Sequence, residues 1–170
     1  HTDSSAASDV YKRQMLICDG ANKPFFFKMT GTGALSDRTF FAGEITVDST
    51  TAPTVGVIHE NHFVVGGAPT AKNKIFFSAT LDPESFSGTG SGSIQLTDAI
   101  VGLASFRSDL IIFCKNSIFK LINISDSSNI AIVPITQNVG CLDGNSIQEI
   151  GGDLLFLSPD GIRTVAGTAR

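Results

Sequence analysis

Two of the three histidines, His59 and His62, lie three residues apart in the chain. Histidine side chains can bind metal ions or move protons in catalysis. Residues three apart on a strand face opposite sides, so the pair could hold a metal together only from a turn. Glu60-Asn61 between them reads as such a turn, and neither histidine has a recognisable serine or cysteine nucleophile motif. We expect polar residues at a loop tip, with metal binding as the alternative.

A second pair of polar residues, Asp82 and Glu84, has the chemistry of the paired carboxylates of a glycosidase. Pro83 stands between them, and this arrangement is more typical of residues that shape a turn. The segment Gly88-Thr89-Gly90-Ser91-Gly92 resembles a phosphate-binding loop only in composition. No helix is expected after it and no lysine stands where a P-loop needs one. It is predicted to be part of a flexible loop over 87–93.

Oxygen ligands for Ca²⁺ occur at Asp126-Ser127-Ser128-Asn129, but the spacing of a calcium-binding loop is missing, and a solvated hairpin tip is expected. Asn123-Ile124-Ser125 is a formal glycosylation sequence that matters only in a secreted eukaryotic protein. The three cysteines are Cys18, Cys114 and Cys141. They form no CxxC pair, and Cys18 and Cys114 are expected inside strands as small buried residues. The sequence thus predicts no catalytic residue, no cofactor and no metal.

The elements that carry these residues recur along the chain. Four apolar clusters start 47, 47 and 44 residues apart: Leu16-Ile17-Cys18, Phe63-Val64-Val65, Leu110-Ile111-Ile112 and Leu154-Leu155-Phe156. Each cluster runs into a turn-rich stretch and then a second short apolar run. A period in the forties that is built from short strands is typical of β-propeller blades. Regular strand spacing in any all-β chain is the alternative explanation.

The whole chain reads as short strands rich in Phe, Val and Ile, bounded by Gly, Asn, Asp, Ser and Thr. No window keeps a helical apolar period, and a helix could lie only around 83–87. Pro134 predicts an edge strand over 131–136. The expected fold is all-β: an incomplete β-propeller with two near-complete four-stranded blades at 55–98 and 99–143, flanked by partial blades at 15–50 and 145–170. Apolar runs on both sides of a strand indicate blades that are buried between neighbours.

The first residues are expected to be foreign to this fold. Ser4 to Gln14 read SSAASDVYKRQ, which resembles one translated frame of a transposase-type sequencing adapter. We therefore expect residues 1–14 to be a non-native, disordered segment and 15–170 to be a metagenomic fragment of one longer propeller domain. Tyr11 is the only tyrosine, and the chain has no tryptophan. The expected fragment would expose blade faces and be poorly soluble alone.

Composition narrows the possible functions. The chain carries a net charge of −4 and its Lys and Arg residues do not cluster, which argues against a general nucleic-acid coat. The longest apolar runs are about five residues, far from the ~20 that a membrane-spanning helix needs. With 16% charged and 42% hydrophobic residues, the chain has the composition of a folded domain. The cysteine pattern suits a reducing cytoplasm.

Several runs together resemble a known family. They are His62 to Gly67, Asn73 to Ala79, Leu81 to Phe86, Ile100 to Phe106, Leu110 to Lys115, Gly140-Cys141, Ser146 to Gly152 and Leu155 to Gly161. As an ensemble they are similar to the β-propeller-bearing tail tubular, nozzle or stabilisation proteins of short-tailed bacteriophages. Phenylalanine stands here where that family often has tyrosine or tryptophan.

The resemblance implies a structural virion protein and not an enzyme. Copies of the chain would pack with one another and with other tail proteins as a ring or tube at the phage tail, after assembly in the bacterial cytoplasm. The ring would help to retain and deliver DNA, with passive contact to the exiting strand and with no small-molecule ligand. The alternatives are a propeller-fold glycoside hydrolase or polysaccharide depolymerase, or a bacterial surface adhesion propeller. The missing tryptophan argues against sugar binding.

Overall fold

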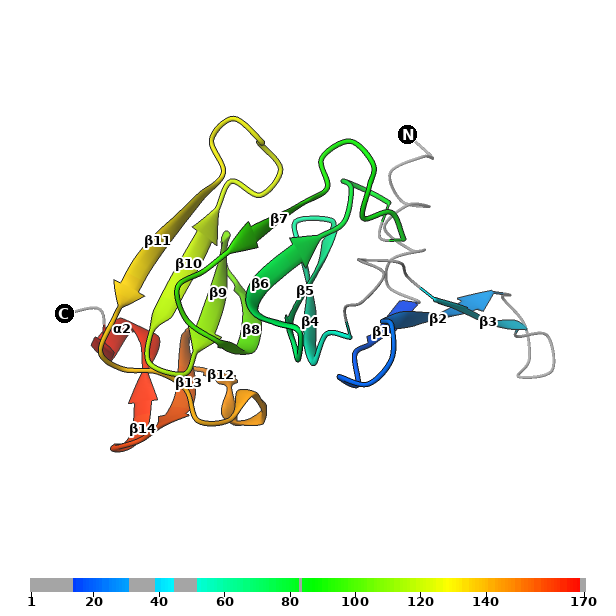
Figure 1. Ribbon diagram of the computed structural model, residues 1–170. Coiled ribbons are helices and arrows are strands. Elements are labelled where there is room, and N and C mark those ends of the chain that lie inside the picture. The colour runs from blue at the N-terminus through cyan, green and yellow to red at the C-terminus, as the bar shows by residue number, and fades with distance from the viewer. Residues whose placement is uncertain (1–13, 31–38, 45–51, 83, 169–170) are drawn as a thin grey trace.

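The computed structural model describes residues 14–30, 39–44, 52–82 and 84–168 (Figure 1). Within these ranges the chain is all-β, as the sequence predicts, and its strands form four antiparallel sheets. The expected disorder of residues 1–14 falls on undescribed residues, except that Gln14 already begins the first strand. In each sheet, neighbouring strands follow one another in the chain, so every sheet is a simple meander.

The four sheets are named here A to D in chain order. Sheet A has β1 (Gln14–Ile17), β2 (Phe25–Thr30) and β3 (Thr39–Glu44), and sheet B has β4 (Val55–His59), β5 (His62–Ala68), β6 (Ala71–Phe77) and β7 (Gly92–Gln95). Sheet C has β8 (Ile100–Phe106), β9 (Asp109–Cys114), β10 (Ile118–Ile122) and β11 (Ala131–Thr136). Sheet D has β12 (Gln148–Ile150), β13 (Asp153–Ser158) and β14 (Gly161–Thr164), with the 3₁₀ turn η2 (Gly144–Ser146) before it and the short helix α2 (Val165–Thr168) after it.

The first hairpin of sheets B, C and D closes in each case with a two-residue turn. Glu60 and Asn61 have φ of 44° and 63°, Arg107 has φ of 56°, and Gly151 and Gly152 have φ of 62° and 81°. Positive φ matches the turn to the right-handed twist of the flanking strands. These turns recur with the period of the apolar clusters, so the repeat in the sequence is a repeat of hairpins.

Sheets B, C and D pack as successive layers, with sheet C between the other two (Figure 1). Alternate residues of β9 point to opposite faces: Leu110, Ile112 and Cys114 pack in one core with sheet B. Ile111 and Phe113 pack in a second core with Leu154 and Phe156 of sheet D. Both faces of β9 are therefore buried, which is why this strand is apolar throughout.

Three local expectations can be compared with the strands directly. Pro134 lies in β11, which is an edge strand of sheet C, so that prediction is confirmed. The flexible loop expected at 87–93 is wrong at its end, because Gly92 starts β7. A Cβ on Gly92 would lie 2.8 Å from the ring of its partner Phe77, so the glycine makes room for the ring. The short helix lies at 165–168 and not near 83–87.

Candidate functional site

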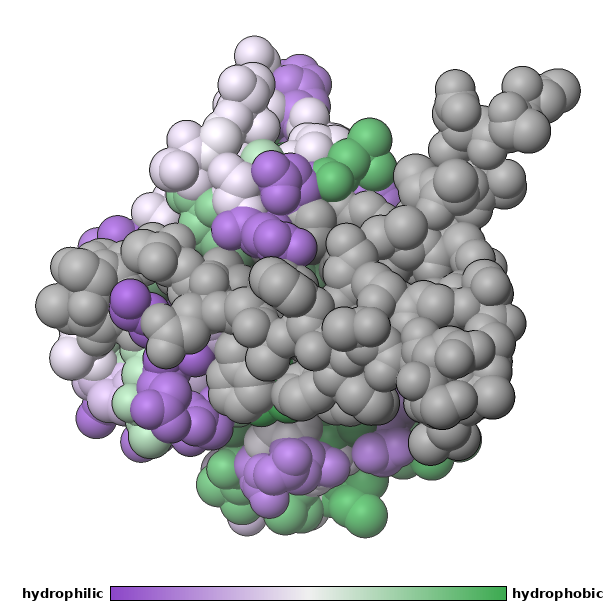
Figure 2. All heavy atoms as spheres, turned by 90° about the vertical axis from the view of Figure 1, so that its right-hand side faces the viewer, coloured by the Kyte–Doolittle hydropathy of each residue, from purple (hydrophilic) through white to green (hydrophobic). Residues whose placement is uncertain are grey.

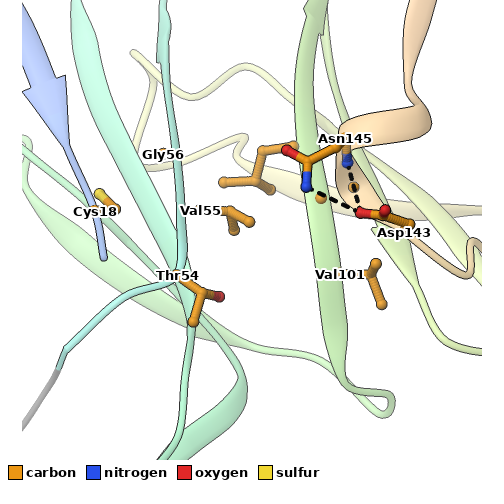
Figure 3. A pocket seen from close by; sticks show the side chains of 10 residues that line it. Cys18, Thr54, Val55, Gly56, Val101, Asp143 and Asn145 are labelled. Atoms are coloured by element: carbon orange, nitrogen blue, oxygen red, sulfur yellow. Dashed lines mark hydrogen bonds between the residues drawn. The ribbon is translucent and has the colours of Figure 1, made fainter. Parts of the chain in front are cut away.

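The end of β1, the first strands β4 and β8, and the η2 turn surround one cleft of about 470 Å³. It is lined by Cys18, Thr54, Val55, Gly56, Val101, Gly102, Leu103, Asp143, Gly144 and Asn145. Figure 3 shows Cys18 on one side of the cleft and Asp143 with Asn145 on the other, with β4 and β8 between them. Between sheets B and C, β4 and β8 also form the most extensive strand-to-strand contact. The beginnings of sheets A, B and C and the η2 turn that precedes sheet D therefore meet at this cleft.

Polar groups at this cleft are used to hold the backbone in place. Asp143 caps the η2 turn, and its Oδ1 accepts hydrogen bonds from the Asn145 backbone N–H at 2.9 Å and from Asn145 Nδ2 at 3.2 Å. The Thr54 hydroxyl donates to the Gly67 carbonyl at 3.0 Å, where β5 bulges. These side chains shape the cleft by capping and pinning turns, and the close packing leaves Asp143 engaged by its own loop.

Two glycines let sheet C approach the η2 turn backbone to backbone. A Cβ on Gly144 would lie 2.4 Å from the Val101 carbonyl oxygen. A Cβ on Gly102 would lie 3.1 Å from the Gly144 Cα and 2.4 Å from Ile147 Cδ1. A side chain at either position would collide with this contact, so the glycines serve close approach here.

Cys18 is the one residue of the cleft with nucleophilic chemistry. It follows the last residue of β1 and is half-buried, so its expected place inside a strand is wrong. Burial, and then the charge of Asp19, raise the pKa of its thiol to about 12. Burial raises the pKa of Cys114, which is fully buried in β9 as expected, to about 12 as well. The Cys18 thiol is therefore protonated at neutral pH, which disfavours it as a nucleophile.

The two histidines lie elsewhere, at the interface of sheets B and C, and the expectation of a polar loop tip is wrong. His59 ends β4 and His62 begins β5, so the turn makes them partners across the hairpin and places them on one face. Both side chains are buried, with 2% and 0% of their surface exposed. The turn residues Glu60 and Asn61 are the exposed tip.

Each histidine has hydrogen-bonding partners that arrive from distant parts of the chain. His59 Nδ1 is 2.8 Å from Ser105 Oγ of β8. His62 Nδ1 lies 2.6 Å from the Ser78 carbonyl oxygen, which can only accept, so Nδ1 carries the proton. His62 Nε2 lies 3.3 Å from Ser125 Oγ of the β10–β11 loop. The pair is a buried polar link between two sheets, and its chemistry is hydrogen bonding.

Burial lowers the pKa of His59 below its ordinary value of 6.5. Nearby His62 also lowers it, whereas the carboxylates of Glu60 and Asp109 act in the opposite direction. Because the pKa of His59 is lower in the folded protein, the unfolded chain binds more protons at this residue than the folded chain does. The difference exists between the lowered pKa and about pH 6.5. Neutral His59 therefore makes its full contribution to the free energy of unfolding above about pH 6.5. This contribution is lost as the pH falls toward the lowered pKa of the folded protein.

We expect the free energy of unfolding to decrease between pH 7.5 and pH 5.5, with part of that decrease due to His59. In His59→Gln the dependence on pH should be shallower, because the titrating group is gone. Denaturant titrations at several pH values measure this slope. Ser105→Ala removes the partner at 2.8 Å but keeps the imidazole, so it should retain a steep slope. A His59→Gln slope as steep as that of the unmodified protein would assign the effect to other groups.

The remaining sequence candidates lie in turns. Asp82 Oδ1 accepts from the Glu84 backbone N–H at 3.3 Å, and both residues are exposed, as expected of residues that shape a turn. In the Asp126 loop, both carboxylate oxygens accept from within the loop, from the Ser128 backbone N–H at 3.0 Å and from Asn129 Nδ2 at 2.7 Å. The hydrogen bond from the Asn129 side chain lowers the Asp126 pKa. This loop is the exposed hairpin tip that its sequence predicts.

Two broader findings concern the described part of the chain. Among residues 14–30, 39–44, 52–82 and 84–168, no three or more His, Cys, Asp or Glu side chains gather in a way that could hold a metal ion. In the same ranges, no helix has the length and apolar character needed to cross a membrane. Compared with known proteins, the chain matches no family model and no curated protein.

Proposed function

We propose that this chain is a structural segment of a β-propeller, and that it belongs to a tail tubular, nozzle or stabilisation protein of a short-tailed bacteriophage. The observation that carries the proposal is the meeting of the first strands of sheets A, B and C with the η2 turn before sheet D. β1 approaches β4, β4 approaches β8, and β8 approaches the η2 turn before sheet D. Sheets that approach one another at their leading ends and stack through apolar faces have the arrangement expected of blades around an axis.

The placement of the family-like residues supports the same proposal. The run His62 to Gly67 forms β5, and Asn73 to Ala79 covers most of β6, so the two resembling runs are adjacent strands of sheet B. The runs Ile100 to Phe106 and Leu110 to Lys115 form the first hairpin of sheet C. The resemblance therefore follows the hairpins that repeat along the chain.

In this role the residues act by packing. Copies of the protein would form a ring or tube at the phage tail, alongside other tail proteins, and would help to retain and deliver DNA. An enzyme acting on surface polysaccharide is the second class of function that the sequence leaves open. The buried histidine pair and the engaged Asp143 favour the structural role, because their polar atoms already serve the fold.

Mass spectrometry of purified particles tests the proposal. Phage from the source community, purified on a density gradient, should contain peptides from 52–168 at a ratio to capsid protein that stays constant across the particle peak. Peptides found only in the host lysate and not in the particle fractions would overturn it. Incubation of the protein with host surface polysaccharide is the second arm, and release of soluble sugar would favour the enzyme instead.

A further inference from the structure

In the stack of sheets B, C and D, the interface between sheets B and C holds histidines that the interface between sheets C and D lacks. Each sheet has two residues that flank the turn of its first hairpin. They are His59 and His62 in sheet B, Phe106 and Asp109 in sheet C, and Ile150 and Asp153 in sheet D. No histidine follows His62 in the chain. Mild acid, in the range where imidazoles ordinarily titrate, therefore acts mainly on the first of these two interfaces.

The histidine pair lies at one end of the apolar core that joins sheets B and C. Val64 belongs to this core and stands two residues after His62, so both side chains are on one face of β5. The ring of Phe77, another member of the core, meets the His62 ring edge-on, with 6.2 Å between centroids. Ile124 of sheet C belongs to the same core and directly precedes Ser125, a partner of His62. A displacement of the imidazoles would therefore disturb the apolar contact between the two sheets.

The hydrogen bonds of His62 use a neutral ring. Its Nδ1 donates to the Ser78 carbonyl, so Nε2 carries no proton and can accept from a hydroxyl. Two hydroxyls face Nε2, Ser125 Oγ at 3.3 Å and Thr80 Oγ1 at 3.4 Å. They come from the β10–β11 and β6–β7 loops, which lie at the same end of the stack (Figure 1). Figure 2 shows mostly hydrophilic to neutral surface at this upper end, so water can reach the pair once the sheets part there.

The charged groups around the pair give it little compensation. The carboxylates of Glu60 and Asp109 favour a charged His59, but Glu60 is exposed and screened by solvent. Asp109 is already paired with Lys120 at 3.3 Å. The carboxylates of the two neighbouring loops bond within those loops: Asp82 and Asp126. Burial outweighs these charges, and the pKa of His59 is lowered.

We propose that His59 and His62 form an acid-sensitive latch between sheets B and C, which opens when the pair is protonated while sheets C and D stay packed. Like charges at directly paired positions of two strands repel each other. A charge that is buried away from water is costly, and opening of the interface hydrates both rings. The inference does not use the phage context and needs only the packing of sheets B and C. It goes beyond a general loss of stability, because one interface opens before the other.

Two buried cysteines report on the two interfaces separately. Cys114 is 0% exposed in the core between sheets B and C, and Cys141 is 1% exposed in the core between sheets C and D. Lys115 and Lys120 lie between them, so trypsin places them in different peptides. The full chain is incubated with a pyridyl disulfide, which reacts with thiols in mild acid, at pH 7.5, 6.5 and 5.5. Mass spectrometry after digestion without reductant then gives the labelling rate of each cysteine.

The ratio of the Cys114 rate to the Cys141 rate should rise at least about fivefold from pH 7.5 to pH 5.5, since each proton bound on opening changes the open population by up to about tenfold per pH unit. The ratio removes the effect of pH on thiol reactivity, which both cysteines share. In the double variant His59→Gln/His62→Gln it should change by less than about twofold. A constant ratio in the unmodified protein, or an equal rise in the double variant, would overturn the latch.

A second pair of variants does not alter the buried residues. Glu60→Gln removes an exposed carboxylate that favours the charged form of His59, so the rise in the ratio should move to lower pH by about 0.3 units. Glu84→Gln is the matched control, because Glu84 is an exposed carboxylate of the β6–β7 loop and is not among the charges that act on His59. It should leave the pH of the rise unchanged. No shift in Glu60→Gln, or the same shift in both variants, would contradict the proposal.

Discussion

Replacing Gly140 by alanine is expected to lower the free energy of unfolding by about 3 kcal/mol. Gly140 lies in the connection from β11 to η2 and packs on the β9–β10 turn. A Cβ there would lie 2.1 Å from the Lys115 carbonyl oxygen, 2.2 Å from its carbonyl carbon and 2.4 Å from the Asn116 nitrogen. All three are backbone atoms of a tight turn, so no side chain can rotate to relieve the overlap.

The surrounding hydrogen bonds oppose a shift of the chain. The Cys141 N–H donates to the Cys114 carbonyl at 2.9 Å, and the Cys114 N–H donates to the Ser117 carbonyl at 2.9 Å. Moving Gly140 away from Lys115 would break the first of these bonds, and both partners are buried. A buried backbone group left without a partner costs about 1–3 kcal/mol, so relaxation is no cheaper than the overlap.

Denaturant titration of Gly140→Ala measures the loss, and thermal unfolding should show a midpoint lower by roughly 6–12 °C. Gly151→Ala is the control. A Cβ on Gly151 meets no atom within 4 Å, but its φ is +62°, so only backbone strain of about 1–2 kcal/mol is added. Equal losses in the two variants would mean that the crowding at Gly140 is relieved without cost.

Gly140 also shows which kind of contact could not be predicted from the sequence. The strand interiors and tight turns were predictable, because β-branched and aromatic runs ending at Asp, Asn or Gly are local signals. The approach of Gly140 to Lys115 joins segments that no local pattern connects. The same holds for β7, whose Gly92 reads as part of a flexible loop until Phe77 is placed beside it.

The histidine pair could be located from sequence but its environment could not. The turn at Glu60-Asn61 was readable, and it implies that His59 and His62 share a face. Their burial depends on Ser105 and Ser125, which lie 46 and 63 residues further along the chain. One signal was available: both histidines flank apolar strands, and the face they share alternates with exposed positions in β4.

Sheet C shows why the repeated apolar clusters of the sequence predict which residues are buried better than they predict functional residues. Its second strand is covered on both sides, so every residue from Leu110 to Cys114 is selected for packing. Side chains in such a layer contribute by the apolar area that they remove from water. A change at the contact between sheets C and D should therefore have one of the largest effects in the molecule.

Truncation of Phe113 to alanine is expected to cost about 4 kcal/mol of unfolding free energy. Phe113 is fully buried, and its ring centroid lies 5.3 Å from that of Phe156 of sheet D, with an interplanar angle of 56°. The truncation removes a buried aromatic ring and leaves a cavity between the sheets. Because domains are stable by only about 5–15 kcal/mol, Phe113→Leu provides a milder variant with a loss of about 1–2 kcal/mol.

A double-mutant cycle tests whether the rings of Phe113 and Phe156 contact each other across sheets C and D. Phe113→Ala, Phe156→Ala and the double variant should give a coupling energy of about 1 kcal/mol, since each ring is the other's partner. Leu157→Ala is the matched control: Leu157 is next to Phe156 in β13 but on the opposite, exposed face of the strand, so the loss should be below about 1 kcal/mol with no coupling to Phe113. Strictly additive losses for the two phenylalanines would mean that the rings are not in contact in solution. The stack of sheets would then lack an interface that the proposed function requires.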